Sequence, residues 1–141
     1  MTIAEVENEI IEEFEMFEQW DDKYQYVIDL GKSLAPLDET KKTDDRLIKG
    51  CQSRVWLFTE MKSGLIYFRA DSDAIITKGL VALMIRVLSG HTAKEIMEAP
   101  LSFIDKIGLK DHLSPTRANG LLSMVKQMKL DALALSSKRD S

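Results

Sequence analysis

The chain has 141 residues, 45% of them hydrophobic and 30% charged, and a formal net charge of −4. This length and composition are typical of one soluble globular domain, which we expect to span residues 1–141 with a frayed tail over 136–141. The acidic balance argues against nucleic acid as a partner, and no uncharged apolar run is long enough to cross a membrane.

The first part of the chain predicts a pair of helices. Thr2 and Glu5 have the spacing of a capping box, and apolar residues then recur every three or four positions, as in an amphipathic helix ending near Glu18. Acidic residues occupy its opposite face, which we interpret as a solvated surface. A second helix is expected to begin at Asp21 or Asp22 as N-cap, and a polar loop follows it.

The pattern then changes to that of β-structure. The stretches "LIK" (47–49), "RVWLFTEM" (54–61) and "LIYFRAD" (65–71) are rich in β-branched and aromatic residues. A tight hairpin loop ending at Gly64 separates the last two. We therefore predict a three-stranded antiparallel meander, with Cys51 near its first turn.

Helical periodicity returns in the second half. A nearly all-apolar helix is expected from a cap at Ser72 or Asp73 to a stop at Gly90, in a central position on the sheet. A last long helix is expected with Ser114 as N-cap and Pro115 in its first position. This order of elements predicts an α+β fold with an N-terminal helix pair, an antiparallel sheet covered by helices, and a long C-terminal helix.

Cys51 is the single cysteine of the chain, which rules out an intramolecular disulfide and favours a reducing compartment. A free cysteine usually acts as a small buried hydrophobe. Here, however, it follows a glycine and precedes polar Gln52 and Ser53, and reactive groups concentrate on such turns. The nearby cations Lys49 and Arg54 would favour the thiolate. The residues alone leave a packed and a reactive cysteine equally open.

A reactive thiol at position 51 is compatible with different classes of function. A cysteine-dependent hydrolase or transferase would need a histidine base, for which His112 is the candidate. A carrier is simpler, because it needs one nucleophilic thiol on a mobile loop and a partner that delivers and removes a group. Alternatively, the chain is a non-catalytic interaction domain in which Cys51 is packed. No ligand spacing supports a metal site.

The stretch "GCQSRVWL" (50–57) closely resembles the signature of the SufE family, sulfur-acceptor proteins for cysteine desulfurases. The stretches "WDDKYQYVIDLGKSL" (20–34), "DSDAIITKGLVAL" (71–83) and "LSPTRANGL" (113–121) resemble further blocks of that family, in the same order. The resemblance covers nearly the whole chain. It implies a fold with a curved antiparallel sheet, similar to that of iron–sulfur scaffold proteins.

The resemblance also implies a function. A pyridoxal-phosphate cysteine desulfurase would pass sulfur to Cys51 as a persulfide, its turnover would be stimulated, and the sulfur would move on to an iron–sulfur assembly scaffold. The carrier itself would need no cofactor. We expect a cytoplasmic protein, with a homodimer left open. We also expect Cys51 to point into an apolar pocket when the protein is alone and to swing outward on docking.

Other residues carry over as supporting or partner-binding positions. Asp73 matches an acidic residue of the family, which would cap a helix, hold the cysteine loop or face the partner. Arg117 matches the arginine of the "SP-S/T-R" block and would pair with a carboxylate such as Asp73 or with a partner surface. Gln52 and Ser53 are expected to fix the loop by hydrogen bonds. His112 is placed with the supporting residues, because it precedes the Ser114 cap and could approach the sheet.

Overall fold

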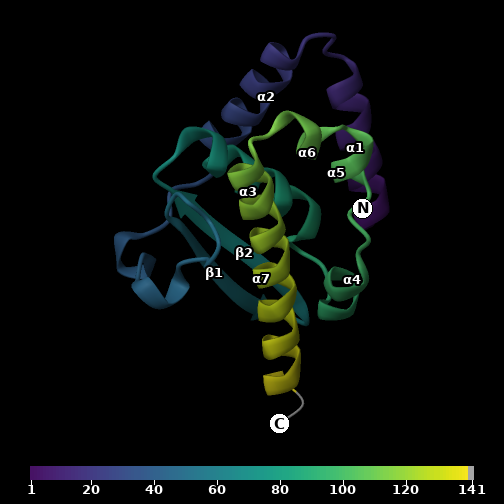
Figure 1. Ribbon diagram of the computed structural model, residues 1–141. Coiled ribbons are helices and arrows are strands. Elements are labelled where there is room, and N and C mark those ends of the chain that lie inside the picture. The colour runs from purple at the N-terminus through teal and green to yellow at the C-terminus, as the bar shows by residue number, and fades with distance from the viewer. Residues whose placement is uncertain (140–141) are drawn as a thin grey trace.

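The computed structural model describes residues 1–139 of the chain. The elements in chain order are α1 (Ile3–Glu15), α2 (Trp20–Lys32), the 3₁₀ turns η1 (Glu39–Lys41) and η2 (Asp44–Arg46), β1 (Val55–Lys62), β2 (Leu65–Ser72), α3 (Ile75–Leu88), α4 (Ala93–Glu98), α5 (Phe103–Lys106), α6 (Leu109–His112) and α7 (Pro115–Arg139). Figure 1 shows α7 crossing in front of the hairpin formed by β1 and β2. The predicted α+β class is confirmed.

The sheet has two strands, and the prediction of a third was wrong. β1 and β2 pair antiparallel along their whole length. The stretch expected to form the first strand makes a single bridge, Leu47 to Trp56, and the amide of Ile48 donates to the carbonyl of Val55 at 2.9 Å. A ladder cannot grow from this bridge, because η2 ends directly before it and the chain turns at Gly50, whose φ is 92°.

The hairpin turn follows the prediction. Lys62 pairs with Leu65, so the connection has two residues, Ser63 and Gly64, and both have positive φ angles of 54° and 81°. A turn with this handedness matches the right-handed twist of the strands that it joins. The local sequence therefore sets the register of the hairpin.

The two N-terminal helices form as predicted but with shifted ends. Thr2 and Glu5 make the expected capping box, whereas α1 ends at Glu15 rather than near Glu18. The N-cap of α2 is Gln19, so the expected caps Asp21 and Asp22 lie inside its first turn. Carboxylates there still stabilise the helix, because they face its positive dipole end.

Helix α3 is buried nearly all round and forms the centre of the molecule, as its composition predicts. It crosses α2 where two glycines meet. A Cβ on Gly31 would lie 2.7 Å from the amide nitrogen of Gly79, and one on Gly79 would lie 2.8 Å from the carbonyl carbon of Val27. Both distances are too short for real atoms, so the close approach of the helices depends on these glycines.

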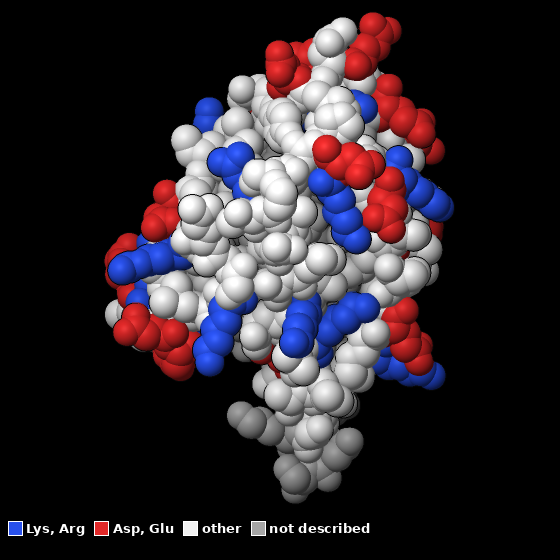
Figure 2. Space-filling model, viewed as in Figure 1, with Lys and Arg blue, Asp and Glu red and all other residues white. Residues whose placement is uncertain are grey.

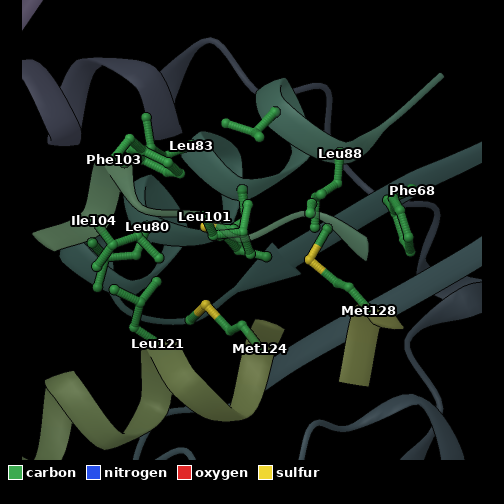
Figure 3. Packing of buried hydrophobic residues seen from close by; sticks show 14 of the residues in the cluster. Phe68, Leu80, Leu83, Leu88, Leu101, Phe103, Ile104, Leu121, Met124 and Met128 are labelled. Carbon is green, nitrogen blue, oxygen red and sulfur yellow. The ribbon is translucent and has the colours of Figure 1, made fainter. Parts of the chain in front are cut away.

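Helix α7 packs against α3 and β1 and helps to enclose the core. Its N-terminus is capped as predicted, since the amide of Arg117 donates to Ser114 Oγ at 3.2 Å. Leu121 and Met124 face Leu80 of α3 in the packed interior (Figure 3). α7 continues through Arg139, into the segment expected to fray; residues 140–141 of that segment lie outside the described part of the chain.

The acidic N-terminal segment is partly neutralised within the fold. The guanidinium of Arg86, which interrupts the apolar sequence of α3, donates to Glu13 Oε1 at 2.8 Å and to Tyr26 Oη at 3.1 Å. It thereby joins α1, α2 and α3. Other acidic side chains remain on the surface where α1 approaches α2, at the top of Figure 2. Within residues 1–139, no helix combines the length and apolarity needed to cross a membrane.

Candidate functional site: a cysteine beside a small cavity

Cys51 lies on the turn between the Leu47 bridge and β1. The turn requires Gly50, because its φ of 92° is strained for other residues and a Cβ there would collide with the hydroxyl of Ser123 on α7. Because Gly50 has no side chain, the turn can lie directly against Ser123 of α7. The prediction that Cys51 occupies a turn beside a glycine is confirmed, and its side chain is half-buried rather than enclosed in the core.

The thiol faces the N-terminal part of α7. Cys51 Sγ donates a hydrogen bond to the main-chain carbonyl of Gly120, with an Sγ···O distance of 3.5 Å. A Cβ at Gly120 would lie 3.6 Å from the same sulfur, so the missing side chain leaves room beside it. An internal glycine in an otherwise helical pattern is a sequence signal for such an approach, but it does not reveal the partner.

A cavity of about 240 Å³ opens beside the sulfur. The residues that line it come from the cysteine turn, α3 and α7: Cys51, Gln52, Ser53, Thr77, Leu80, Ser114, Thr116, Arg117, Gly120 and Met124. Most of these side chains are polar, so the expectation of an apolar pocket was wrong. Leu80 and Met124 supply the apolar part, because both belong to the buried core.

Burial raises the pKa of the Cys51 thiol above its ordinary value. The expectation that Lys49 and Arg54 favour the thiolate was therefore wrong for the protein alone. Adjacency in the sequence does not place those cations against the sulfur, whereas the packing of the turn on α7 removes water from it. In the protein alone, Cys51 is therefore held as a neutral thiol whose S–H group donates a hydrogen bond to the carbonyl of Gly120.

Asp73 fastens the far end of the cysteine turn. Its Oδ1 accepts a hydrogen bond from the amide of Arg54 at 3.1 Å, and Ser72 Oγ donates to the carbonyl of Arg54 at 2.7 Å. The N-cap of α3 is Ala74 and has no side-chain cap bond, so the predicted capping role of Ser72 or Asp73 was wrong. Of the roles considered for Asp73, the contacts favour holding the cysteine loop.

Gln52 and Ser53 line the cavity. The hydrogen bonds that hold the cysteine turn are made by other residues, contrary to expectation. The bonds that hold it join Arg54 to Ser72 and Asp73, and the thiol to α7. Gln52 is exposed and Ser53 is half-buried. Both side chains are therefore placed to meet whatever enters the cavity.

Arg117 lies in the first turn of α7 with its side chain exposed at the cavity. Within the described part of the chain it forms no ion pair, so the expected pairing with Asp73 is absent. Of the residues lining the cavity, it is the one with a charged side chain. Arg117 thus supplies a cation, with no ion-pair partner among the described residues, to the cavity that Cys51 also lines.

His112 is held away from the cysteine. Its ring stacks on Trp20 with centroids 3.7 Å apart, and its Nδ1 lies 3.0 Å from the carbonyl of Gly108. It is not among the residues that line the cavity. The other histidine, His91, has a mostly buried side chain that approaches Glu95 at 3.6 Å, and it does not line the cavity either. A cysteine–histidine catalytic pair therefore has no support in this arrangement.

Asp71, unlike Asp73, is buried, and the sequence did not single it out. Burial by itself would raise the pKa of Asp71, but the amide of Ser72 and the ammonium groups of Lys42 and Lys78 outweigh it, and the pKa is lowered. The two lysines lie 3.2 and 3.3 Å from its oxygens. This network pins the end of β2, next to Asp73. Among residues 1–139, no group of three His, Cys, Asp or Glu side chains could hold a metal ion.

Comparison with known proteins places the chain among SufE domains. Residues 8–132 match the family model of SufE, the Fe-S metabolism associated domain. An uncharacterized SufE-like protein of Rhizobium meliloti is 42% identical over 130 residues, covering 89% of this chain and 93% of that protein. The chloroplastic/mitochondrial SufE-like protein 1 of Arabidopsis thaliana is 40% identical over 132 residues, covering 92% of this chain but 35% of that protein.

A solved structure has a similar fold. The solution structure of a hypothetical protein from Thermus thermophilus superposes with a TM-score of 0.78, covering 94% of this chain and 96% of that one. Its sequence identity is 16%, so the likeness concerns the arrangement of helices and strands.

Proposed function

Since the chain belongs to the SufE family of Fe-S metabolism associated domains, we propose that it accepts sulfur from a cysteine desulfurase onto Cys51. The observation that carries the proposal is the position of the single thiol, on a turn that follows Gly50 and lines a cavity. The proposal includes stimulation of the desulfurase, delivery of the sulfur to an iron–sulfur assembly scaffold and a cytoplasmic location.

The transfer would be a thiol exchange between two proteins. The thiolate of Cys51 attacks the outer sulfur of the desulfurase persulfide, R–S–SH. A new S–S bond forms on Cys51, the old S–S bond breaks, and the desulfurase cysteine leaves as thiolate. The products are Cys51–S–SH and R–S⁻, and one proton leaves the Cys51 thiol before the attack. No external oxidant or reductant is needed, because the outer sulfur moves in its existing oxidation state.

The resting site suits a carrier rather than a catalyst. A neutral, half-buried thiol reacts slowly with small oxidants and alkylating agents, because the thiolate is the nucleophile. The thiol gains reactivity once the turn leaves α7 and the hydrogen bond to Gly120 is lost. We propose that docking of the desulfurase supplies this change, with the turn moving between its anchors at Gly50 and Arg54.

The proposal is tested by mass. The full-length protein is incubated with a cysteine desulfurase and L-cysteine, and its intact mass is measured without reductant. A gain of one sulfur atom in the wild type, absent in Cys51→Ser, supports the carrier. A desulfurase that turns over without any gain on this chain would contradict it. Hydrolysis of esters or amides by the protein alone, lost in Cys51→Ser, would point to a cysteine hydrolase instead.

A further inference from the structure

We propose that Arg117 holds the outer sulfur of the Cys51 persulfide as an anion inside the cavity, so that the site distinguishes the loaded carrier from the empty one. This inference rests on the proposed function, because it concerns the product of sulfur transfer. It assigns to Arg117 a contact with the transported atom.

The first step is the hydrogen bond of the empty state. In the empty protein the Cys51 sulfur carries the thiol proton and donates it in a hydrogen bond to the carbonyl of Gly120. In a persulfide the inner sulfur is bonded to carbon and to the outer sulfur, and it carries no proton. The loaded residue can no longer donate to Gly120 from that atom. The interaction that holds the empty thiol against α7 is therefore lost on loading.

The second step is the charge of the loaded state. A persulfide is a stronger acid than a thiol, because the negative charge rests on a sulfur bonded to another sulfur. The outer sulfur therefore ionises more readily than the empty thiol, whose neutral form burial favours. An anion that enters this cavity needs a cation or hydrogen-bond donors to replace the water that it leaves.

The third step is the lining of the cavity. Its volume of about 240 Å³ is ample for one additional sulfur atom. Arg117 is the charged member of the lining, and the polar side chains of Gln52 and Ser53 stand beside the cysteine. Within the described residues no carboxylate pairs with Arg117, so its guanidinium is free to bind an anion. A guanidinium presents several donors in a fixed plane, which suits a large sulfur anion.

The position of Arg117 on its helix supports the same role. It occupies the first turn of α7, where the helix dipole disfavours a cation. A residue that opposes local preference, with no ion-pair partner among residues 1–139, is typical of a functional site. The dipole and the guanidinium both favour negative charge in front of this end of α7.

The test follows the ionisation of the persulfide itself. The full-length protein is loaded with glutathione persulfide, which needs no desulfurase: the Cys51 thiolate takes the outer sulfur and glutathione leaves as thiolate. The persulfide is then titrated by its ultraviolet absorbance. We expect Arg117→Gln to make the Cys51 persulfide a weaker acid, with an acid dissociation constant about tenfold lower than in the wild type. An adjacent opposite charge commonly changes a pKa by one unit or more. Arg117→Lys should restore most of the wild-type value.

Arg69 provides a matched control. It is an exposed arginine on β2 and does not line the cavity, so Arg69→Gln removes the same charge elsewhere. The Cys51 persulfide of the Arg69→Gln variant should titrate as in the wild type. An Arg117→Gln persulfide that also titrates as in the wild type would overturn the inference. If glutathione persulfide loads the protein but the desulfurase does not, the result counts against the proposed function. The titration result for Arg117 is not affected by that outcome.

Discussion

The thiol of Cys51 donates a hydrogen bond to the carbonyl oxygen of Gly120, 69 residues further along the chain, at 3.5 Å. A thiolate has no proton to donate, so both this contact and the partial burial favour the neutral form. Burial accordingly raises the pKa of Cys51 above its ordinary value of 9.0. The folded protein holds the thiol proton more tightly than the unfolded chain does.

A pH dependence follows from this relationship. Cys51 should react with iodoacetamide more slowly in the folded protein than in urea, and its rate should keep rising with pH after that of the unfolded chain has levelled off. The unfolded chain releases the proton first, so the free energy of unfolding should fall as the pH rises above 9.0. Cys51→Ser removes that part of the slope. A folded-state rate that levels off at lower pH than the unfolded one would contradict the raised pKa.

Asp73 is expected to control how readily the cysteine turn opens. Asp73→Ala removes the acceptor for the Arg54 amide, an exposed hydrogen bond worth about 0.5–1 kcal/mol, and should speed alkylation of Cys51 by about two- to fivefold. Asp73→Asn keeps an oxygen acceptor in place and should behave nearly as the wild type. Asp111→Ala, at an exposed position on α6, is the control. Equal rates in Asp73→Ala and the control would show that the bond does not restrain the turn.

Local sequence signals predicted the features that depend on neighbouring residues. The capping box at Thr2, the hairpin at Gly64 and the start of α7 at Pro115 each need only a few adjacent positions. The prediction of a third strand was wrong because its three residues lie between a 3₁₀ turn and Gly50. The length of a strand depends on the conformation of the residues on both sides of it. A short apolar run does not reveal that competition.

At the candidate site, the sequence predicted the turn that carries Cys51 but not the contacts around it. Cys51 and its turn were found from the glycine and polar residues beside it. The contact with Gly120, the lack of an ion-pair partner for Arg117 among the described residues and the stacking of His112 on Trp20 arise from packing between distant segments. The charge environment of the thiol was misjudged for the same reason, because cations close in sequence were assumed to be close in space.

The crossing of α2 and α3 should tolerate no side chain at Gly79. Alanine is normally a better helix residue than glycine by about 1 kcal/mol. At Gly79, however, the new methyl would meet the main chain of Val27, which cannot move aside cheaply. We expect Gly79→Ala to lower the free energy of unfolding by about 1–3 kcal/mol or more, measured by urea denaturation. An unchanged or raised stability would mean that the helices do not approach as closely as described.

Gly120→Ala should slow the loading of sulfur onto Cys51 without lowering the stability of the fold. A methyl there would lie 3.6 Å from Cys51 Sγ, an ordinary contact, and alanine favours the helix, so stability should be unchanged or raised by about 0.5–1 kcal/mol. The same methyl takes up space beside the sulfur into which a persulfide would extend. We therefore expect slower loading by glutathione persulfide, followed by intact mass, with normal iodoacetamide reactivity after unfolding. Leu122→Ala, at an exposed position on α7, is the control. Loading of Gly120→Ala at the wild-type rate would show that the outer sulfur lies elsewhere, on the side of the turn that faces away from α7.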